Sequence, residues 1–522
     1  MKRKDLSFSA YNFIYASLTL LVYNFYFWRV FFSTVSVPVF ILSIFTSACM
    51  LFTLQRLIFW PKTTKIFSIF FIIMNTLASY FIASYHIILN KTTLANIFDT
   101  NFFEATEWFG VSFWIYMIAF CGLPICFVLW TRIKFENPVK HLKKTLLTGL
   151  LSALLLSICL CYKTDVKIYL KENFNLRYQV VPSSYLSSLV SLGIAKFKKV
   201  PALDSTKGMA QHKYWQDEKK NLVIFVLGES ARDSNFSLSG YNRDTAAPLR
   251  PYLKDMTVFH RTESCGVVTR VSVPCMFSPY DRLSYKEQAI PYTTNVLEIL
   301  NKNNMDLLWL DNELGCNKVC RNITTEFTCN SRDCSDMSLN EKLKKKIPSF
   351  NKDTFVILHQ RGSHGPRYDL RVPEEHRKWT PYCERADSQQ CTHKQLINAY
   401  DNTIYYTSFI VADIIKTLTD LTNEYNPILI YISDHGESLG ENGAWGHGGD
   451  FKDAPEEQKE VPFFVWMPKS TRKVFGFSQK CLNEKTKQKQ SQDVIFHSLL
   501  GLFGIKTDVY KENLDIFNGC HP

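Results

Sequence analysis

Long apolar runs fill the first third of the chain and give way to short ones after it. Five of them approach the length of about 20 mainly apolar residues that a membrane span requires. They cover residues 11–32, 35–54, 66–89, 111–130 and 146–162. The first is too long and aromatic for a signal peptide and lacks a small-residue cleavage site, so we expect it to remain as an anchor. The pattern predicts an α-helical five-span membrane domain over residues 1–163.

Basic residues lie in alternate loops of this domain. They precede the first span, separate the second from the third, and separate the fourth from the fifth. Loops rich in Lys and Arg stay in the cytoplasm, so the N-terminus is predicted to be cytoplasmic. With five spans, the chain after about residue 163 lies outside the cytoplasm. A four-span count would reverse this conclusion.

A bridging segment is predicted at residues 164–215. Within it, residues 183–200 combine apolar positions with Lys196, Lys198 and Lys199. This pattern is typical of a helix that lies on a membrane surface. An ordinary linker helix is the alternative that the pattern leaves open.

From about residue 216 the apolar runs become short and alternate with helical stretches. The runs are residues 222–227, 307–310, 354–358, 428–432 and 463–466, and the helices are near 295–302, 394–421 and 493–503. Nearly continuous apolar strands indicate a sheet that helices cover on both faces. Residues 216–522 are therefore predicted to form an α/β/α sandwich.

Composition narrows the class of protein. The net charge is +12, but much of the basic excess flanks the apolar runs, which argues against a nucleic-acid partner. Gly and Pro are modest at 21 and 20, and aromatic residues reach 14%, which excludes a disordered or fibrous chain.

Ten of the 15 cysteines lie outside the predicted spans, and most have a near neighbour in sequence. This even number suits disulfides in an oxidising compartment, which agrees with the five-span orientation. The expected pairs are Cys265–Cys275, Cys316–Cys320, Cys329–Cys334 and Cys383–Cys391, and elimination leaves Cys481–Cys520. A zinc ribbon at residues 316–334 is the weaker alternative, because its spacing is loose.

Polar side chains follow three of the predicted strands. Glu229 follows the first strand, Asp434 and His435 follow the fourth, and His364 lies in the loop after the third. Sites in open α/β sheets form at the carboxyl ends of strands. Carboxylate and imidazole ligands suit zinc, although each residue alone is more often structural.

A metal site of this kind needs a nucleophile. The segment 264–276 offers Thr269 and Ser272 within one expected disulfide loop. A metal ion lowers the pKa of a hydroxyl and activates it. Both hydroxyls suit this chemistry, so either Thr269 or Ser272 could be the nucleophile.

The longer motifs resemble a known family. They include Gly228-Glu229-Ser230-Ala231-Arg232, Cys265-Gly266 through Pro274-Cys275-Met276-Phe277, Gly362-Ser363-His364-Gly365-Pro366, Ala399-Tyr400-Asp401-Asn402-Thr403 and Ser433-Asp434-His435-Gly436-Glu437. The chain is similar over nearly its whole length to the bacterial phosphoethanolamine transferases that modify lipopolysaccharide, the family of the colistin-resistance enzymes. The resemblance implies a catalytic domain of the alkaline-phosphatase/sulfatase type.

The resemblance also assigns roles. It implies that Thr269 is the nucleophile and that Glu229, Thr269, Asp434 and His435 hold one Zn²⁺. It places His364 and His447 near the phosphate or a second zinc ion. In the external loop, Asn96, Thr100 and Glu104 match donor-lipid residues, and their spacing would put them on one helical face.

Some positions depart from the family pattern. Relatives usually have Asn where Glu313 stands, and the family lysine is one place late here, at Lys318. Asn312 and Lys318 remain candidates for substrate contact. Val267 replaces a threonine two places before the nucleophile, and Arg270 stands where relatives often have a small residue. These changes are compatible with a different acceptor or with no functional effect.

The resemblance implies a two-step reaction in the bacterial inner membrane, with the catalytic domain in the periplasm. Phosphatidylethanolamine donates phosphoethanolamine to Thr269, and lipid A then accepts it, which lowers surface negative charge and polymyxin susceptibility. An inner-core sugar (Kdo or heptose) is the alternative acceptor, and a membrane-anchored phosphodiesterase or phosphatase is the alternative enzyme. A non-catalytic sensor or transporter would need neither metal nor Thr269. A sulfatase would need a Cys/Ser-x-Pro-x-Arg motif, which does not surround Thr269.

Overall fold

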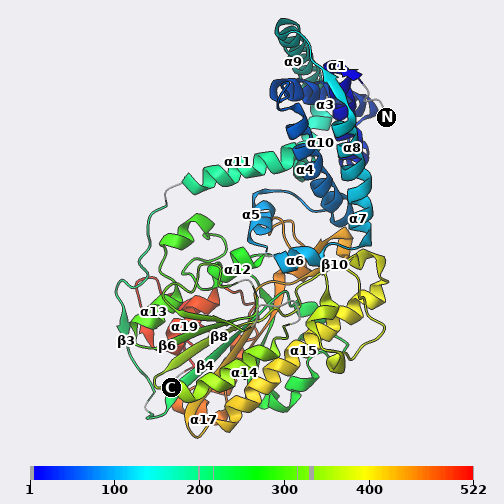
Figure 1. The fold of residues 1–522 in the computed structure, drawn as a ribbon. Helices are drawn as coiled ribbons and strands as arrows, with labels where there is room; N and C mark the ends of the chain where they lie inside the picture. Colours follow the sequence, from blue (N-terminus) through cyan, green and yellow to red (C-terminus); the bar gives the residue numbers. More distant parts are fainter. Residues whose placement is uncertain are drawn as a thin grey trace. The chain divides into compact units, whose positions relative to one another are not determined.

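The structure of the 522-residue chain is a computed structural model. It describes residues 5–100, 102–197, 200–215, 217–313, 315–328 and 334–520. The chain divides into two compact units (Figure 1). The first comprises Met1–Ile97 and Phe109–Ile194, and the second comprises Phe98–Trp108 and Ala195–Pro522. The short segment 98–108 thus clusters with the C-terminal part of the chain, although apolar helices flank it in sequence.

The first unit is helical. Among the residues that the structure describes, four of its helical runs are long and apolar enough to cross a membrane, judged by length and composition. They are α3 (Val37–Ile58), α4 (Thr64–Tyr85), α7 (Val111–Met117) continued through a π-helical turn into α8 (Leu123–Trp130), and α9 (Pro138–Cys161). The shorter helices are α1 (Phe8–Ser17), α2 (Phe25–Phe32), α5 (Lys91–Asp99), α10 (Lys163–Glu172) and α11 (Ser183–Phe197).

The predicted span at residues 11–32 is not one continuous helix. α1 passes into a π-helical turn at Leu18–Val22, and α2 begins only after Asn24. The buried Asn24 amide donates hydrogen bonds to the backbone oxygens of Thr19 and Val181, each at 2.8 Å. A side chain that bonds to nearby backbone competes with the helical pattern. The described residues therefore support four candidate spans and do not confirm the count of five.

The second unit contains a seven-stranded sheet in the order β5-β12-β9-β4-β8-β6-β7. Its strands are β4 (Lys220–Gly228), β5 (Met256–Glu263), β6 (Asp306–Asp311), β7 (Thr324–Phe327), β8 (Thr354–His359), β9 (Tyr425–Ser433) and β12 (Glu460–Trp466). β4 is parallel to β8 and β9, whereas β12 is antiparallel to both of its neighbours. The sequence predicted five of these strands and missed the edge strands β5 and β7, which carry polar residues.

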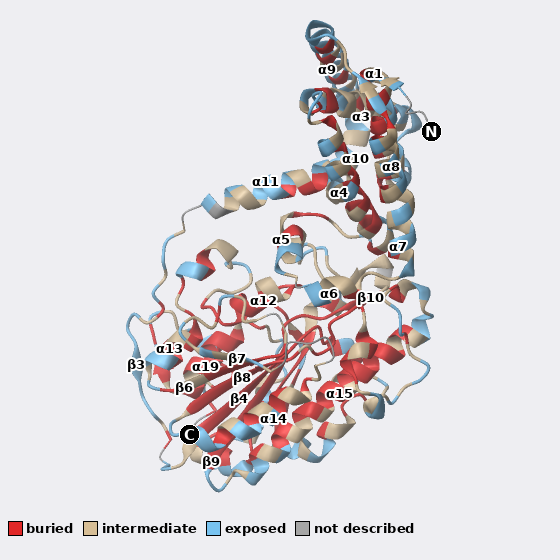
Figure 2. Ribbon diagram, in the orientation of Figure 1, coloured by how far each residue is buried: buried red, intermediate tan, exposed pale blue. Residues whose placement is uncertain are grey.

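Helices cover both faces of the sheet, and the strands between them are buried (Figure 2). They are α12 (Thr269–Met276), α13 (Val296–Lys302) and α19 (Val494–Leu502) on one face, and α14 (Met337–Lys346) and α15 (His393–Asp420) on the other. Alternate residues of β4 explain the two layers: Phe225 packs into the first helical layer, and Ile224 packs into the second. This is the predicted α/β/α sandwich.

Disulfides join segments around the sheet. The structure pairs Cys265 with Cys275, Cys316 with Cys320, Cys383 with Cys391 and Cys481 with Cys520. The remaining predicted pair involves Cys329, which lies outside the described residues. The first of these bonds spans the segment that carries Thr269 and Ser272.

Candidate active site and metal centre

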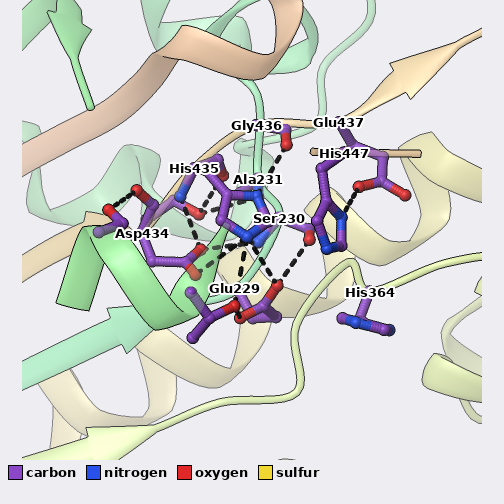
Figure 3. A network of polar contacts seen from close by, with 12 residues as sticks. Glu229, Ser230, Ala231, His364, Asp434, His435, Gly436, Glu437 and His447 are labelled. Carbon is purple, nitrogen blue, oxygen red and sulfur yellow. Dashed lines mark hydrogen bonds and ion pairs between the residues drawn. The ribbon is translucent and has the colours of Figure 1, made fainter. Parts of the chain in front are cut away.

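Three adjacent strands deliver the candidate residues to one edge of the sheet. β4 lies between β8 and β9, with Leu227 opposite His359 on one side and Ile432 on the other. Their carboxyl ends are therefore level, and the residues that follow them converge. Glu229 comes from β4, Asp434 comes from β9, and the loop after β8 brings His364 (Figure 3).

Glu229, Asp434 and His435 form the centre of the site. All three are fully buried, and their ligand atoms lie within 4.8 Å of one another. Thr269 begins α12 and faces this group: its hydroxyl donates a hydrogen bond to Glu229 Oε2 at 3.1 Å and lies 3.3 Å from His435 Nε2. The structure thus brings together the four residues that the sequence singled out.

This group has the chemistry of a cation site. Asp434 Oδ2 is buried and has no hydrogen-bond partner among the described residues. Burial and the neighbouring Asp434 raise the pKa of Glu229 well above its ordinary value. Two carboxylates that crowd together in this way are relieved by a cation.

His435 is prepared as a neutral ligand. Its Nδ1–H donates to the Gly436 carbonyl at 2.9 Å, which directs Nε2 toward the carboxylates. Burial lowers the pKa of His435 to about 4, so the imidazole is neutral at physiological pH. One imidazole, two carboxylates and a hydroxyl within reach fit a divalent cation of the zinc type.

Two further histidines border the centre. His447 Nδ1 donates to Glu437 Oε2 at 2.7 Å, and its ring centroid lies 4.2 Å from that of His435. His364 Nε2 lies 3.3 Å from Glu104 Oε1, and its ring lies 5.4 Å from that of His447. His435, Glu437 and His447 also form a group whose ligand atoms could hold a second ion. The structure therefore brings His364 and His447 to the site.

The surroundings of His364 favour the cationic form of its ring. Burial would lower the pKa of this imidazole, but the carboxylates of Glu104, Glu313 and Glu229 outweigh that effect and raise it well above its ordinary value. A buried imidazole whose pKa is raised in this way suits the binding of an anionic group.

The segment 98–108 supplies Glu104, but the predicted single helical face is interrupted. α5 ends at Asp99, and α6 (Phe102–Glu107) is a separate helix. Asn96 belongs to the first compact unit, whereas Thr100 and Glu104 belong to the second. The regular four-residue spacing suggested one continuous helix and did not reveal this break.

The loop after β6 carries Asn312 and Lys318, the two candidates for substrate contact. Asn312 is buried, and its amide donates to Asp336 Oδ1 at 2.6 Å. Asp336 in turn accepts hydrogen bonds from the backbone of Arg361 and Gly362, so Asn312 supports the loop that carries His364. Lys318 lines a small cavity together with Arg270.

Several supporting residues were not predicted from the sequence. Ser230 has a positive φ of 56°, and its hydroxyl donates to Glu229 Oε1 at 2.7 Å. Its backbone N–H and that of His435 both donate to Asp434 Oδ1, at 3.1 and 2.7 Å. The strained backbone of Ser230 therefore positions two carboxylates. Ser230 directly follows Glu229 in the motif after β4, and this position could have indicated its role from the sequence.

Glu437 was also missed as a site residue. It directly follows Asp434-His435-Gly436, and this position in the motif could have identified it from the sequence. Tyr368 donates to Glu437 Oε1 at 2.9 Å, and His447 uses the other oxygen. Glu437 thereby fixes the orientation of His447.

The fold and the site together define a protein with a helical membrane region and an α/β domain that has the fold of the sulfatases. Residues 221–505 match the family described as Sulfatase, and residues 46–197 match the family described as Phosphoethanolamine transferase EptA/EptB. The chain belongs to the phosphoethanolamine transferase family.

Three similar proteins illustrate this membership. Phosphoethanolamine transferase EptA of Escherichia coli (strain K12) is 36% identical over 86% of this chain and 84% of its own. Phosphatidylethanolamine transferase Mcr-1 of Escherichia coli is 32% identical over 85% and 84%. The solved integral membrane protein lipooligosaccharide phosphoethanolamine transferase A of Neisseria meningitidis superposes with a TM-score of 0.93 at 27% identity, covering 99% of this chain and 100% of that one.

Proposed function

We propose that this enzyme transfers phosphoethanolamine from phosphatidylethanolamine to lipid A through a covalent intermediate on Thr269. The observation that carries the proposal is the position of the Thr269 hydroxyl, within hydrogen-bond distance of both Glu229 and His435 at a buried edge of the sheet. An inner-core sugar, Kdo or heptose, is the second candidate acceptor. The lipooligosaccharide named for the Neisseria relative is compatible with both acceptors.

In the first step the Thr269 oxygen attacks the donor phosphorus, and the bond from phosphorus to the glycerol oxygen breaks. Glu229 accepts the hydrogen bond of the hydroxyl and is placed to take its proton. Diacylglycerol leaves with a proton, and phosphoethanolamine stays on the threonine. In the second step an acceptor oxygen attacks the same phosphorus, and Thr269 recovers its proton as it leaves.

Glu229, Thr269, Asp434 and His435 would hold one Zn²⁺, and His364 and His447 border the phosphate or a second ion. Bound zinc would lower the pKa of the Thr269 hydroxyl and neutralise negative charge on the phosphoryl oxygens. The neighbouring carboxylates raise the pKa of His364, which favours a cationic ring for binding the phosphate, and Glu437 orients His447. Thr100, Glu104, Asn312 and Lys318 remain proposed contacts for the substrates, as does Asn96 in the first unit.

The proposed arrangement of the chain across the membrane follows from the apolar runs and the basic loops of the sequence. We propose a membrane domain at residues 1–163 with five crossings, in which residues 11–32 cross despite the break at Asn24, and with a cytoplasmic N-terminus. Residues 164–215 form a bridge with an interfacial helix, and residues 216–522 form a periplasmic catalytic domain at the bacterial inner membrane. Disulfides in the second unit support an oxidising compartment. Transfer would reduce surface negative charge and polymyxin susceptibility.

Mass spectrometry of lipopolysaccharide from a host that expresses the protein tests this proposal. We expect a phosphoethanolamine increment on lipid A, lost by at least about 10³-fold in Thr269→Ala because the nucleophile is absent. Thr419→Ala, which removes the hydroxyl of an exposed threonine on α15, is the matched control and should retain the increment.

The other outcomes separate the alternatives. An increment on the core alone moves the acceptor to Kdo or heptose and keeps the chemistry. Free phosphoethanolamine released with no modified lipid identifies a phosphodiesterase or phosphatase. Atomic emission on purified protein measures bound zinc. A zinc content that the control retains and Asp434→Asn loses would support the proposed ligand set.

A further inference from the structure

Three carboxylates of the segment 98–108 contact basic side chains elsewhere in the second unit. Asp99 pairs with Arg270, which directly follows the nucleophile. Glu104 pairs with His364, and Glu107 pairs with Arg371. The segment belongs by its contacts to the same compact unit as these partners. Its role therefore extends beyond connecting two apolar helices.

The Glu107–Arg371 pair is the most buried of the three. The side chains are 3% and 4% exposed. The geometry is bidentate, since Nη1 donates to Glu107 Oε1 at 3.1 Å and Nη2 donates to Oε2. A planar guanidinium held at two oxygens has its orientation fixed as well as its position.

The third edge of this guanidinium reaches the site. Arg371 Nε donates to the backbone carbonyl of His364 at 2.9 Å. Because Glu107 fixes both terminal nitrogens, it also fixes the direction in which Nε points. The His364 side chain meanwhile contacts Glu104, one helical turn before Glu107 on α6. Helix α6 thus holds His364 by its ring directly and by its backbone through Arg371.

We propose that Glu107 is a positioning residue for phosphoryl transfer, which acts through Arg371 on His364. This inference rests on the proposed function, because it gives the 98–108 segment the task of setting the position of the His364 ring at the candidate site. Small displacements of a group that contacts the phosphate reduce the rate of chemistry more than they reduce binding. The contribution of Glu107 is therefore expected in kcat.

The test uses the full-length protein in nanodiscs containing phosphatidylethanolamine with a fluorescent acyl chain. The rate of diacylglycerol release reports the first half-reaction, which a transferase and a hydrolase share. We expect Glu107→Gln to lower kcat by about 10- to 100-fold with little change in KM. Arg371→Lys should act similarly, because an ammonium cannot hold the carboxylate and the His364 carbonyl in one plane.

Two comparisons separate positioning from general stability. Asp255→Asn breaks another largely buried pair of the same unit, that with Arg472, where the side chains are 17% and 10% exposed, and it should leave kcat unchanged even if it lowers the melting temperature. The double variant Glu107→Gln/Arg371→Lys should be no slower than the slower single variant, because the two residues act as one device.

Hydrogen exchange supplies a readout that does not depend on turnover. The Ser363 N–H donates to the Glu229 carbonyl at 2.9 Å, and the His364 N–H donates to the Arg361 carbonyl at 3.2 Å. In Glu107→Gln we expect faster exchange in the loop at residues 361–365 and unchanged protection in β4. Normal kcat together with unchanged loop exchange in Glu107→Gln would overturn the proposal. The wild type could instead release free phosphoethanolamine while Glu107→Gln still lowers kcat. That result would refute the transfer function and leave the positioning role of Glu107 standing.

Discussion

Gly362 lies where the loop after β8 crosses the backbone of Glu229. Its φ is +51°, and a Cβ built on it would lie 2.6 Å from the Glu229 carbonyl oxygen. A side chain at this position therefore meets both a strained conformation and a backbone that cannot move without shifting a candidate ligand.

We expect Gly362→Ala to lower the free energy of unfolding by about 1–3 kcal/mol and to reduce bound zinc. Gly519→Ala is the matched control, because Gly519 also has a positive φ of 74° but a Cβ added to it would meet no atom of the described residues within 4 Å. The control should show the conformational cost and keep its metal. Chemical denaturation and metal analysis check both variants, and equal zinc in the two would refute the close-approach argument.

At the scale of elements, the sequence predicted the interior of the sheet better than its edges. The strands beside β4 are nearly all apolar, so their patterns were visible, whereas the edge strand β7 reads Thr-Thr-Glu-Phe. Hydropathy also missed the break at Asn24, since composition does not record where one amide bonds. These features depend on contacts between residues distant in sequence.

The candidate site likewise contains residues that could be predicted from the sequence and residues that could not. Glu229, Asp434 and His435 were predictable because they directly follow buried strands, and the resemblance chose Thr269 over Ser272. Ser272 instead donates to the Asp434 carbonyl and to Gln492 Oε1. Residues that act through a partner, such as Arg371 on His364, lie in short segments without an apolar period, here a single 3-10 turn at Tyr368–Arg371. No sequence pattern indicates such pairs.

The disulfides close loops of very different length, and this difference predicts their effects. Cys481–Cys520 spans 39 residues, whereas Cys316–Cys320 spans 4. The loop-entropy relation gives about 4 kcal/mol for the longer loop and about 2 kcal/mol for the shorter one. Cys481→Ala/Cys520→Ala should therefore lower stability more than Cys316→Ala/Cys320→Ala, as measured by urea unfolding. The reverse order would show that chain entropy does not control these bonds.

Asp515 makes the stability of the C-terminal elements depend on pH. It accepts hydrogen bonds from the Tyr510 hydroxyl at 2.7 Å and from the Phe517 N–H at 2.8 Å, and it packs against Gly501 of α19. Burial raises its pKa from 3.8 to about 6. The folded state then binds a proton more tightly than the unfolded state between these values, so this group's contribution falls as pH rises from 4 to 6.

The shift corresponds to about 3 kcal/mol lost by pH 7. Asp515→Asn keeps the shape without the charge, and its amide can donate to the Tyr510 oxygen. We expect this variant to flatten the stability profile between pH 4 and 7 and to be more stable than wild type at pH 7. Parallel profiles for the two proteins in denaturant titrations would contradict the assignment.

At the scale of the whole molecule, the division into two compact units predicts that unfolding is not a single two-state transition. The candidate metal ligands Glu229, Asp434 and His435 all belong to the second unit. A metal that binds only the folded form stabilises the unit that holds it, by about 2.7 kcal/mol at a free concentration 100 times the Kd.

Chelation should therefore destabilise the second unit and leave the first unit's transition where it was. Hydrogen exchange on detergent-solubilised protein, followed by peptide across a temperature series, resolves the two transitions. Peptides from β4 and β9 should lose protection at lower temperature after chelation, and so should peptides from segment 98–108, because that segment clusters with the second unit. Peptides from α3 and α9 should not change.

Asp434→Asn separates loss of metal from other effects of the chelator. It removes a buried charge that has no hydrogen-bond partner at Oδ2 among the described residues, so the metal-free variant should match or exceed the stability of metal-free wild type. It should also show no further shift on chelation, since it has little metal to lose. A chelator effect of equal size in the variant, or one that spreads to α3 and α9, would mean that the ion stabilises the protein from somewhere other than this site.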